Sequence, residues 1–117
     1  VRAAIDVLAA TPGRKILVLG DMGEIGGQAG QFHDEVGGYA KSQGVDQLFA
    51  LGEQSELASR NFGAGGRHFD GVEALLEALS PQLGSDTAVL VKGSRFMRME
   101  RVADAIAEED NPKNGAH

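Results

Sequence analysis

The chain has 117 residues, a formal net charge of -6 and no cysteine, and its length fits one compact domain. Without cysteine there can be no disulfide, cysteine zinc site or thiol nucleophile, and no apolar run approaches the roughly 20 residues of a membrane-spanning helix. With 5% aromatic residues and a pI near 4.9, the composition also argues against general nucleic-acid binding, which needs a broad basic face or stacking rings.

Strands that alternate with helices are predicted along most of the chain. We expect helices where apolar residues recur every three or four positions, and strands where short aliphatic runs are bounded by glycine. The expected helices cover residues 2–10, 29–43, 53–62 and 71–83, followed by a last helix with apolar residues Phe96, Met99, Ala103 and Ile106. The expected strands cover residues 15–20, 47–52, 67–69 and 87–93. Residues 109–117 have no apolar stripe and are expected to form a disordered tail.

This order of elements predicts a single Rossmann-like α/β domain, with a mostly parallel sheet and helices on both faces. In such sheets ligands bind beyond the carboxyl ends of the strands. Three loops should lie there, at residues 21–30, 52–55 and 92–95.

Basic residues are concentrated after the last predicted strand, where four of the chain's 11 lysines and arginines lie between positions 92 and 101. The segment 92–95 reads Lys-Gly-Ser-Arg. Its glycine permits close backbone approach, its serine can cap the following helix, and its two cations favour an anion beside the helix N–H groups. We therefore expect an anion site there. For Arg98 and Arg101, further along the helix, pairing with acidic residues on a solvated face is the preferred interpretation.

The glycine-rich loop "GDMGEIGG" is not a nucleotide cradle. It departs from the GxGxxG pattern, and no GxxxxGK[ST] phosphate loop occurs in the chain. Asp21 and Glu24 could hold a metal or an ammonium group, although acidic residues beside glycines are more often solvated. His33, one turn into the following helix, has the same two interpretations, and a structural role is favoured.

Five segments carry a resemblance to a known family. They are "RKILVLGDMGEIG", "HDEVGGYA", "LFALGE", "HFD" and "VLVKGSRFMRMERV", in that order. Together they resemble the carboxyl-terminal domain of the Mur ligases, and the first and last of them are the specific parts. The resemblance runs from about Val1 to Ile106, so we assign residues 1–108 to that domain.

Within the family, the chain is most similar to the enzymes that add D-Ala-D-Ala to UDP-MurNAc-tripeptide. This resemblance implies a bacterial, cytoplasmic ligase of peptidoglycan synthesis that uses ATP and Mg²⁺. In the family, ATP activates the tripeptide carboxylate, and the dipeptide amine then attacks it. The UDP-sugar site and the phosphate loop belong to N-terminal and central domains. Because this chain has no phosphate loop, we expect it to be a fragment of such a ligase, inactive by itself.

The resemblance also implies which residues bind substrate. Lys92, Gly93, Ser94 and Arg95 match the family loop that approaches the incoming amino substrate, so they are expected to contact D-Ala-D-Ala. A guanidinium can hold both oxygens of a carboxylate, which suits Arg95 to the dipeptide carboxylate.

The opposite wall of the site is expected at the glycine-rich loop and the helix after it. There the resemblance implies Asp21 and His33 as further substrate contacts, whereas His68 and Phe69 are expected to have a structural role in a strand. No catalytic residue and no metal ligand is expected in this fragment, and neither ATP nor Mg²⁺ is expected to bind to it alone.

A second class of function fits the same alternation of elements. A receiver-like regulatory domain without enzymatic activity could place Asp21 after the first strand and Lys92 after the last. It also needs an aspartate at the end of a middle strand, where this chain has Leu51, Gly52 and Glu53.

Overall fold

The computed structural model describes residues 2–21, 29–84 and 86–93; the last predicted helix and the tail lie outside these residues. One parallel sheet is formed by β1 (Arg14–Gly20), β2 (Gln47–Leu51), β3 (Gly66–Phe69) and β4 (Thr87–Lys92). The helices are α1 (Arg2–Ala10), α2 (Ala29–Ser42), α3 (Glu56–Phe62) and α4 (Val72–Leu79), and a 3-10 turn (Ser80–Gln82) continues α4. The predicted α/β class is therefore confirmed.

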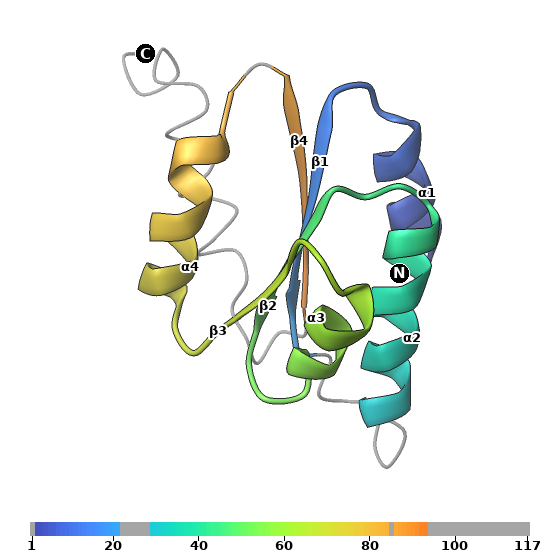
Figure 1. The fold of residues 1–117 in the computed structure, drawn as a ribbon, viewed down its shortest axis with the longest axis vertical. Helices are drawn as coiled ribbons and strands as arrows, with labels where there is room; N and C mark the ends of the chain where they lie inside the picture. The colour runs from blue at the N-terminus through green and yellow to red at the C-terminus, as the bar shows by residue number, and fades with distance from the viewer. Residues whose placement is uncertain (1, 22–28, 85, 94–117) are drawn as a thin grey trace.

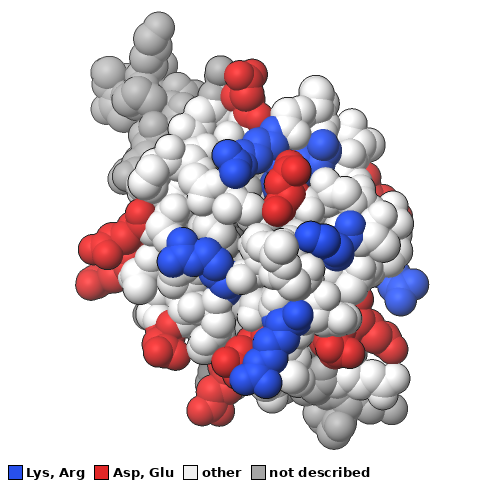
Figure 2. Space-filling view, viewed as in Figure 1, with Lys and Arg blue, Asp and Glu red and all other residues white. Residues whose placement is uncertain are grey.

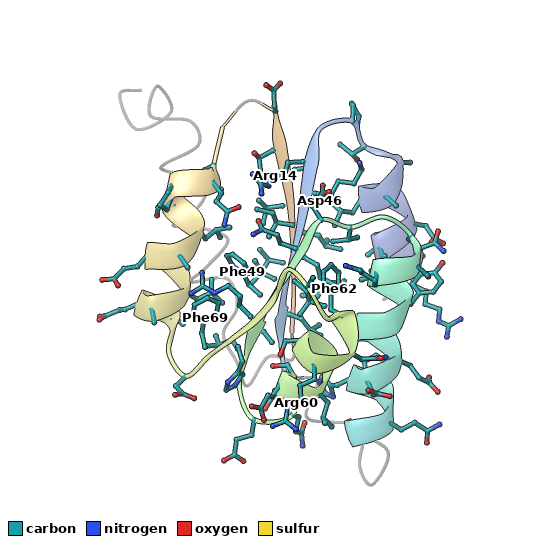
Figure 3. All side chains as sticks on the ribbon, viewed as in Figure 1. Arg14, Asp46, Phe49, Arg60, Phe62 and Phe69 are labelled. Carbon is teal, nitrogen blue, oxygen red and sulfur yellow. The ribbon has the colours of Figure 1, made fainter. Side chains whose placement is uncertain are left out.

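Helices cover both faces of the sheet, with α1, α2 and α3 on one side and α4 on the other (Figure 1). Successive strand residues point to opposite faces. In β1, Leu17 and Leu19 accordingly pack in the core beneath α1 to α3, while Ile16 and Val18 pack in the core beneath α4. This burial on both faces explains the unbroken apolar run in the sequence. Phe62 lies in the first core and Phe49 in the second, on opposite sides of the sheet (Figure 3).

Helices α2 and α3 pack closely because glycine faces the contact. A Cβ atom added at Gly37 would lie 2.1 Å from the backbone oxygen of Ala58, so no larger residue fits at this separation. Beside this contact, the Asn61 side chain donates a hydrogen bond to the backbone oxygen of Asp34 at 2.6 Å. The glycine pair in "HDEVGGYA" is thus a helix-packing feature.

Two element boundaries differ from the sequence prediction by more than one residue. Helix α3 begins at Glu56 rather than at residue 53, because the preceding residues form a turn in which Gly52 has a φ of 108°. Helix α4 ends at Leu79, before the 3-10 turn that contains Pro81. Proline has no backbone N–H and disfavours the interior of an α-helix, so it accounts for the shorter helix.

The strand order β3-β2-β1-β4 fixes where a ligand would bind. The chain moves outward from β1 to β3 and then returns to the other side of β1, so the order reverses between β1 and β4. Ligands of open α/β sheets bind at such a reversal, beyond the carboxyl ends of the strands. Receiver domains have the order 2-1-3-4-5 instead, so the receiver-like alternative is wrong for this fold.

Candidate functional site

The carboxyl ends of the strands form the candidate site, which lies at the lower edge of the sheet in Figure 1. In the strand register, Leu19 pairs with Lys92 and Gly20 pairs with Leu51, so β1, β2 and β4 end at nearly the same level. Lys92, which is half-buried, follows Ala88 and Leu90 at the two-residue period of the strand. Its position is therefore on the face that α1, α2 and α3 cover.

Asp21 follows β1 directly and binds the turn between β2 and α3. Its Oδ1 accepts a hydrogen bond from the backbone N–H of Ser55 at 2.7 Å, and its Oδ2 accepts one from the N–H of Gln54 at 3.2 Å. These two donors belong to the turn that leads from β2 into α3. The structure thus gives the predicted contact residue Asp21 a bonding role inside the domain.

The same turn receives hydrogen bonds from two other side chains. The buried Ser55 hydroxyl donates to the backbone oxygen of Leu51 at 2.8 Å and to that of Gly52 at 3.2 Å. The Nε2 atom of His68, on β3, lies 2.9 Å from the Gly52 oxygen. Because a carbonyl oxygen only accepts, Nε2 carries the hydrogen in this contact. The sequence prediction assigned His68 a strand role but missed this bond, since nothing local in "HFD" points to residue 52.

His33 lies on α2, in the face that packs on the sheet, and its side chain is 0% exposed. Its ring contacts that of Phe32 edge-on, with 5.6 Å between ring centroids. The spacing of His33 and Val36 on the buried side of the helix is the signal that favours a structural role. The structure therefore brings Asp21 and Lys92 to adjacent strand ends, while His33 lies inside the domain.

Several predicted positions lie outside the described residues, namely Glu24, Ser94 and Arg95. Within residues 2–21, 29–84 and 86–93, no group of three or more histidine or acidic side chains could hold a metal ion. In the same described part of the chain, no helix has the length and hydropathy to span a membrane. Figure 2 shows basic and acidic side chains mixed across the face in view, without a continuous basic surface.

Comparison with known families assigns the class. The family model for the Mur ligase glutamate ligase domain matches residues 1–95, and the chain therefore belongs to the Mur ligase family. Among its relatives is the UDP-N-acetylmuramoyl-tripeptide-D-alanyl-D-alanine ligase of Escherichia coli (strain K12), which is 40% identical over 108 residues. The ligase of the same name from Synechocystis sp. is 33% identical over 112 residues. The resemblance recognised from the motifs is thus confirmed.

Solved structures agree with this assignment. MurF from Acinetobacter baumannii superposes with a TM-score of 0.76 at 28% identity, covering 92% of this chain and 24% of that one. The MurF ligase from Thermotoga maritima in complex with ADP gives a TM-score of 0.75 at 25% identity, covering 94% and 25%. The match to the Escherichia coli ligase likewise covers 91% of this chain and 24% of the relative. The chain thus spans about a quarter of the length of the relatives it matches.

Proposed function

We propose that the chain is the C-terminal domain of a ligase that joins D-Ala-D-Ala to UDP-MurNAc-tripeptide. Family membership supports the ligase class, and the names of the relatives supply the two substrates. The observation that carries the proposal is the position of Lys92 and Gly93, at the carboxyl end of β4 where the strand order reverses. A ligand of this fold is expected at that position.

In this proposal, the β4 end binds the carboxylate of the incoming dipeptide. Lys92 supplies a cation, and Gly93 allows the ligand to approach the backbone; Ser94 and Arg95, the next two residues, complete the set of contacts. Asp21 belongs to the opposite side of the same corner, whereas His33 is buried inside the domain and is assigned no contact with the dipeptide. Holding the carboxylate directs the dipeptide amine away from this domain, toward the remaining three quarters of the ligase. Such fixed orientation is a large source of rate acceleration in reactions between two substrates.

We assign no contact with ATP or Mg²⁺ to the described residues of this chain. The sequence has no phosphate loop, and the described part holds no metal-binding group of side chains. We place both cofactors, and UDP-MurNAc-tripeptide, on N-terminal and central domains of a cytoplasmic bacterial ligase. There ATP would activate the tripeptide carboxylate for attack by the amine. No step of that activation is assigned to residues of this chain.

A chimera tests the proposal. This chain would replace the matched quarter of the Escherichia coli ligase, and formation of the pentapeptide product from D-Ala-D-Ala would be measured. We expect ATP-dependent ligation by the chimera and no ATP hydrolysis by the chain alone. A folded chimera that binds the other substrates but ligates no D-Ala-D-Ala would refute the proposal, as would ATP turnover by the isolated chain.

The role of Lys92 has a matched control at the other end of the sheet. Lys92→Ala in the chimera should raise the KM for D-Ala-D-Ala by about tenfold or more, with a smaller change in kcat, because the carboxylate is bound in both ground and transition states. Lys15 lies at the start of β1, and its Nζ donates to the Gly13 oxygen at 3.2 Å. Lys15→Ala should leave this KM unchanged. Equal effects of the two substitutions would contradict the assignment of Lys92.

A further inference from the structure

The start of α3 lacks a cap from its own sequence. Ser55 occupies the N-cap position, but its side chain makes no capping hydrogen bond to the helix. Its hydroxyl donates backward to the Leu51 and Gly52 oxygens. Serine at this position normally accepts a hydrogen bond from an N–H of the first helical turn. In this structure the N–H groups of Leu57 and Ala58 are bound by the backbone oxygens of Gln54 and Ser55, at 3.3 and 3.0 Å. The N–H groups of Gln54 and Ser55 themselves are bound by a residue more than thirty positions earlier, Asp21.

The backbone of the turn is shaped around this carboxylate. Gly52 has a φ of 108°, and a Cβ atom added there would lie 2.6 Å from the Asp21 Cγ. Glycine is therefore needed at position 52 both for its conformation and for the space that the carboxylate occupies. His68 also contacts the Gly52 oxygen. The turn after β2 is therefore bound both by Asp21, which follows β1, and by His68, which lies on β3.

We propose that Asp21 is a positioning residue of the ligand-binding edge rather than a contact of the ligand, a role that rests on the function proposed above. Its carboxylate already fills the place where the N–H groups of the β2–α3 turn would bind an anion. The substrate carboxylate therefore binds at the carboxyl end of β4 and not at this turn. Because β1 lies between β2 and β4, the bonds of Asp21 also fix the exit of β1 opposite Lys92, through the Leu19–Lys92 pair.

The amino ends of the strands provide a matched control. Asp46 precedes β2, and its Oδ2 accepts a hydrogen bond from the Lys15 N–H at 2.8 Å. It thus resembles Asp21 in binding the backbone N–H of a neighbouring segment, but it lies at the amino ends of the strands, remote from the proposed ligand. A purely stabilising role would change only the unfolding of either variant, whereas a positioning role predicts a kinetic effect for Asp21 alone.

Kinetics of the chimera test the proposal. Asp21→Asn removes the charge and one acceptor, and we expect the KM for D-Ala-D-Ala to rise about tenfold, with kcat reduced less and the KM for ATP unchanged. Asp46→Asn should leave all three constants within about twofold, a spread that ordinary surface substitutions show. Both variants are assayed well below their unfolding temperatures. An unchanged dipeptide KM in Asp21→Asn, or equal rises in both variants, would overturn the positioning role.

Backbone NMR of the 117-residue chain tests the same proposal without activity. Asp21→Asn should shift the amide protons of Gln54 and Ser55 upfield and also shift those of Lys92 and Gly93. Changes confined to residues 52–55 would show a local cap and overturn the proposal. If Asp21→Asn fails to fold, Asp21→Glu, which keeps the carboxylate on a longer stem, should shift the same four amides. An inactive chimera of native sequence would refute the ligase function, while these amide shifts would still decide whether Asp21 positions the edge.

Discussion

The two ends of the sheet use the same kind of bond for different purposes. At the amino end, exposed Asp46 accepts one backbone hydrogen bond, from Lys15, and its own N–H donates to the Lys15 oxygen at 2.9 Å. Figure 3 shows Asp46 and Arg14 together at this end. At the carboxyl end, half-buried Asp21 accepts two, from Gln54 and Ser55. Asp46 therefore supplements a backbone pairing that already exists, whereas Asp21 binds two N–H groups of the turn before α3 through its side chain alone.

Glycines of positive φ pack against aspartates at both ends of the sheet. Gly13, with a φ of 92°, would place an added Cβ 2.2 Å from the backbone oxygen of Asp86. At Gly52 the nearest atoms belong instead to the side chain of Asp21. A backbone obstacle cannot move without breaking the sheet, but a side chain can rotate away. The amino end is thus rigid through its backbone, and the carboxyl end depends on one side chain.

The largest expected effects come from alanine at these glycines. Gly13→Ala should lower the free energy of unfolding by about 2–4 kcal/mol, because backbone strain and a steric clash add. Gly52→Ala should lower the free energy of unfolding by slightly less, since the Asp21 side chain can rotate away from the added methyl group. Urea denaturation measures both. In an Asp21→Ala background the Gly52→Ala penalty should shrink, and strict additivity of the two substitutions would contradict this account of the carboxyl end.

The next effect compares the aspartates directly. Asp21→Ala should lower the free energy of unfolding by about 2 kcal/mol, because two N–H groups lose a charged acceptor in a half-buried turn. Asp46→Ala should lower it by less than about 1 kcal/mol, because water replaces the carboxylate at an exposed position. Thermal unfolding of the two variants gives the difference. A larger loss in Asp46→Ala would reverse the comparison.

Serine hydroxyls sharpen the comparison further. Ser55→Ala removes a buried donor to the Leu51 oxygen and should cost about 1–2 kcal/mol of unfolding free energy. Ser42 makes a similar bond, to the Tyr39 oxygen at 2.7 Å, but it is exposed. Ser42→Ala should change stability by less than about 0.5 kcal/mol. Equal losses of unfolding free energy in the two variants would show that burial of Ser55 does not strengthen its hydrogen bond.

The smallest effect concerns an aspartate at neither end. On the surface between α1 and α2, the Tyr39 hydroxyl donates a hydrogen bond to Asp6, which raises the pKa of Tyr39. A pKa above the unfolded value, about 10, means that this bond stabilises the fold below that pH and stops doing so as pH rises through the folded pKa. Tyr39 is the only tyrosine and tryptophan is absent, so ultraviolet titration reads it directly. Asp6→Asn should lower the pKa of Tyr39, and an unchanged titration would show that Asp6 is not the cause.

The repeating parts of the fold could be predicted from the sequence, whereas the long-range bonds could not. Helix α1 has the predicted bounds, and the apolar run of β1 marked a strand buried on both faces. These features follow from hydrophobic period alone. The hydrogen bonds that bind the turn before α3 did not, because their acceptor, Asp21, lies 33 residues before Gln54.

The candidate site divides in the same way. Asp21 directly follows one apolar run and Lys92 ends another, so both were expected at strand ends. The structure places them there. The order of the strands, which brings β4 beside β1, was not contained in the alternation of elements. It excludes the receiver-like interpretation, and it accompanies the packing of α4 on the opposite face.

The outermost described strand, β3, has a consequence for the behaviour of concentrated solutions. It is four residues long and pairs only with β2 among the described strands. Its exposed Arg67 lies over the ring of Phe69, with 5.1 Å from the guanidinium carbon to the ring centroid, and exposed Asp70 follows at once. A second molecule that tried to extend the sheet would find few free N–H and C=O groups and charged side chains on and beside the strand. Short, charged edges of this kind discourage aggregation through strand pairing.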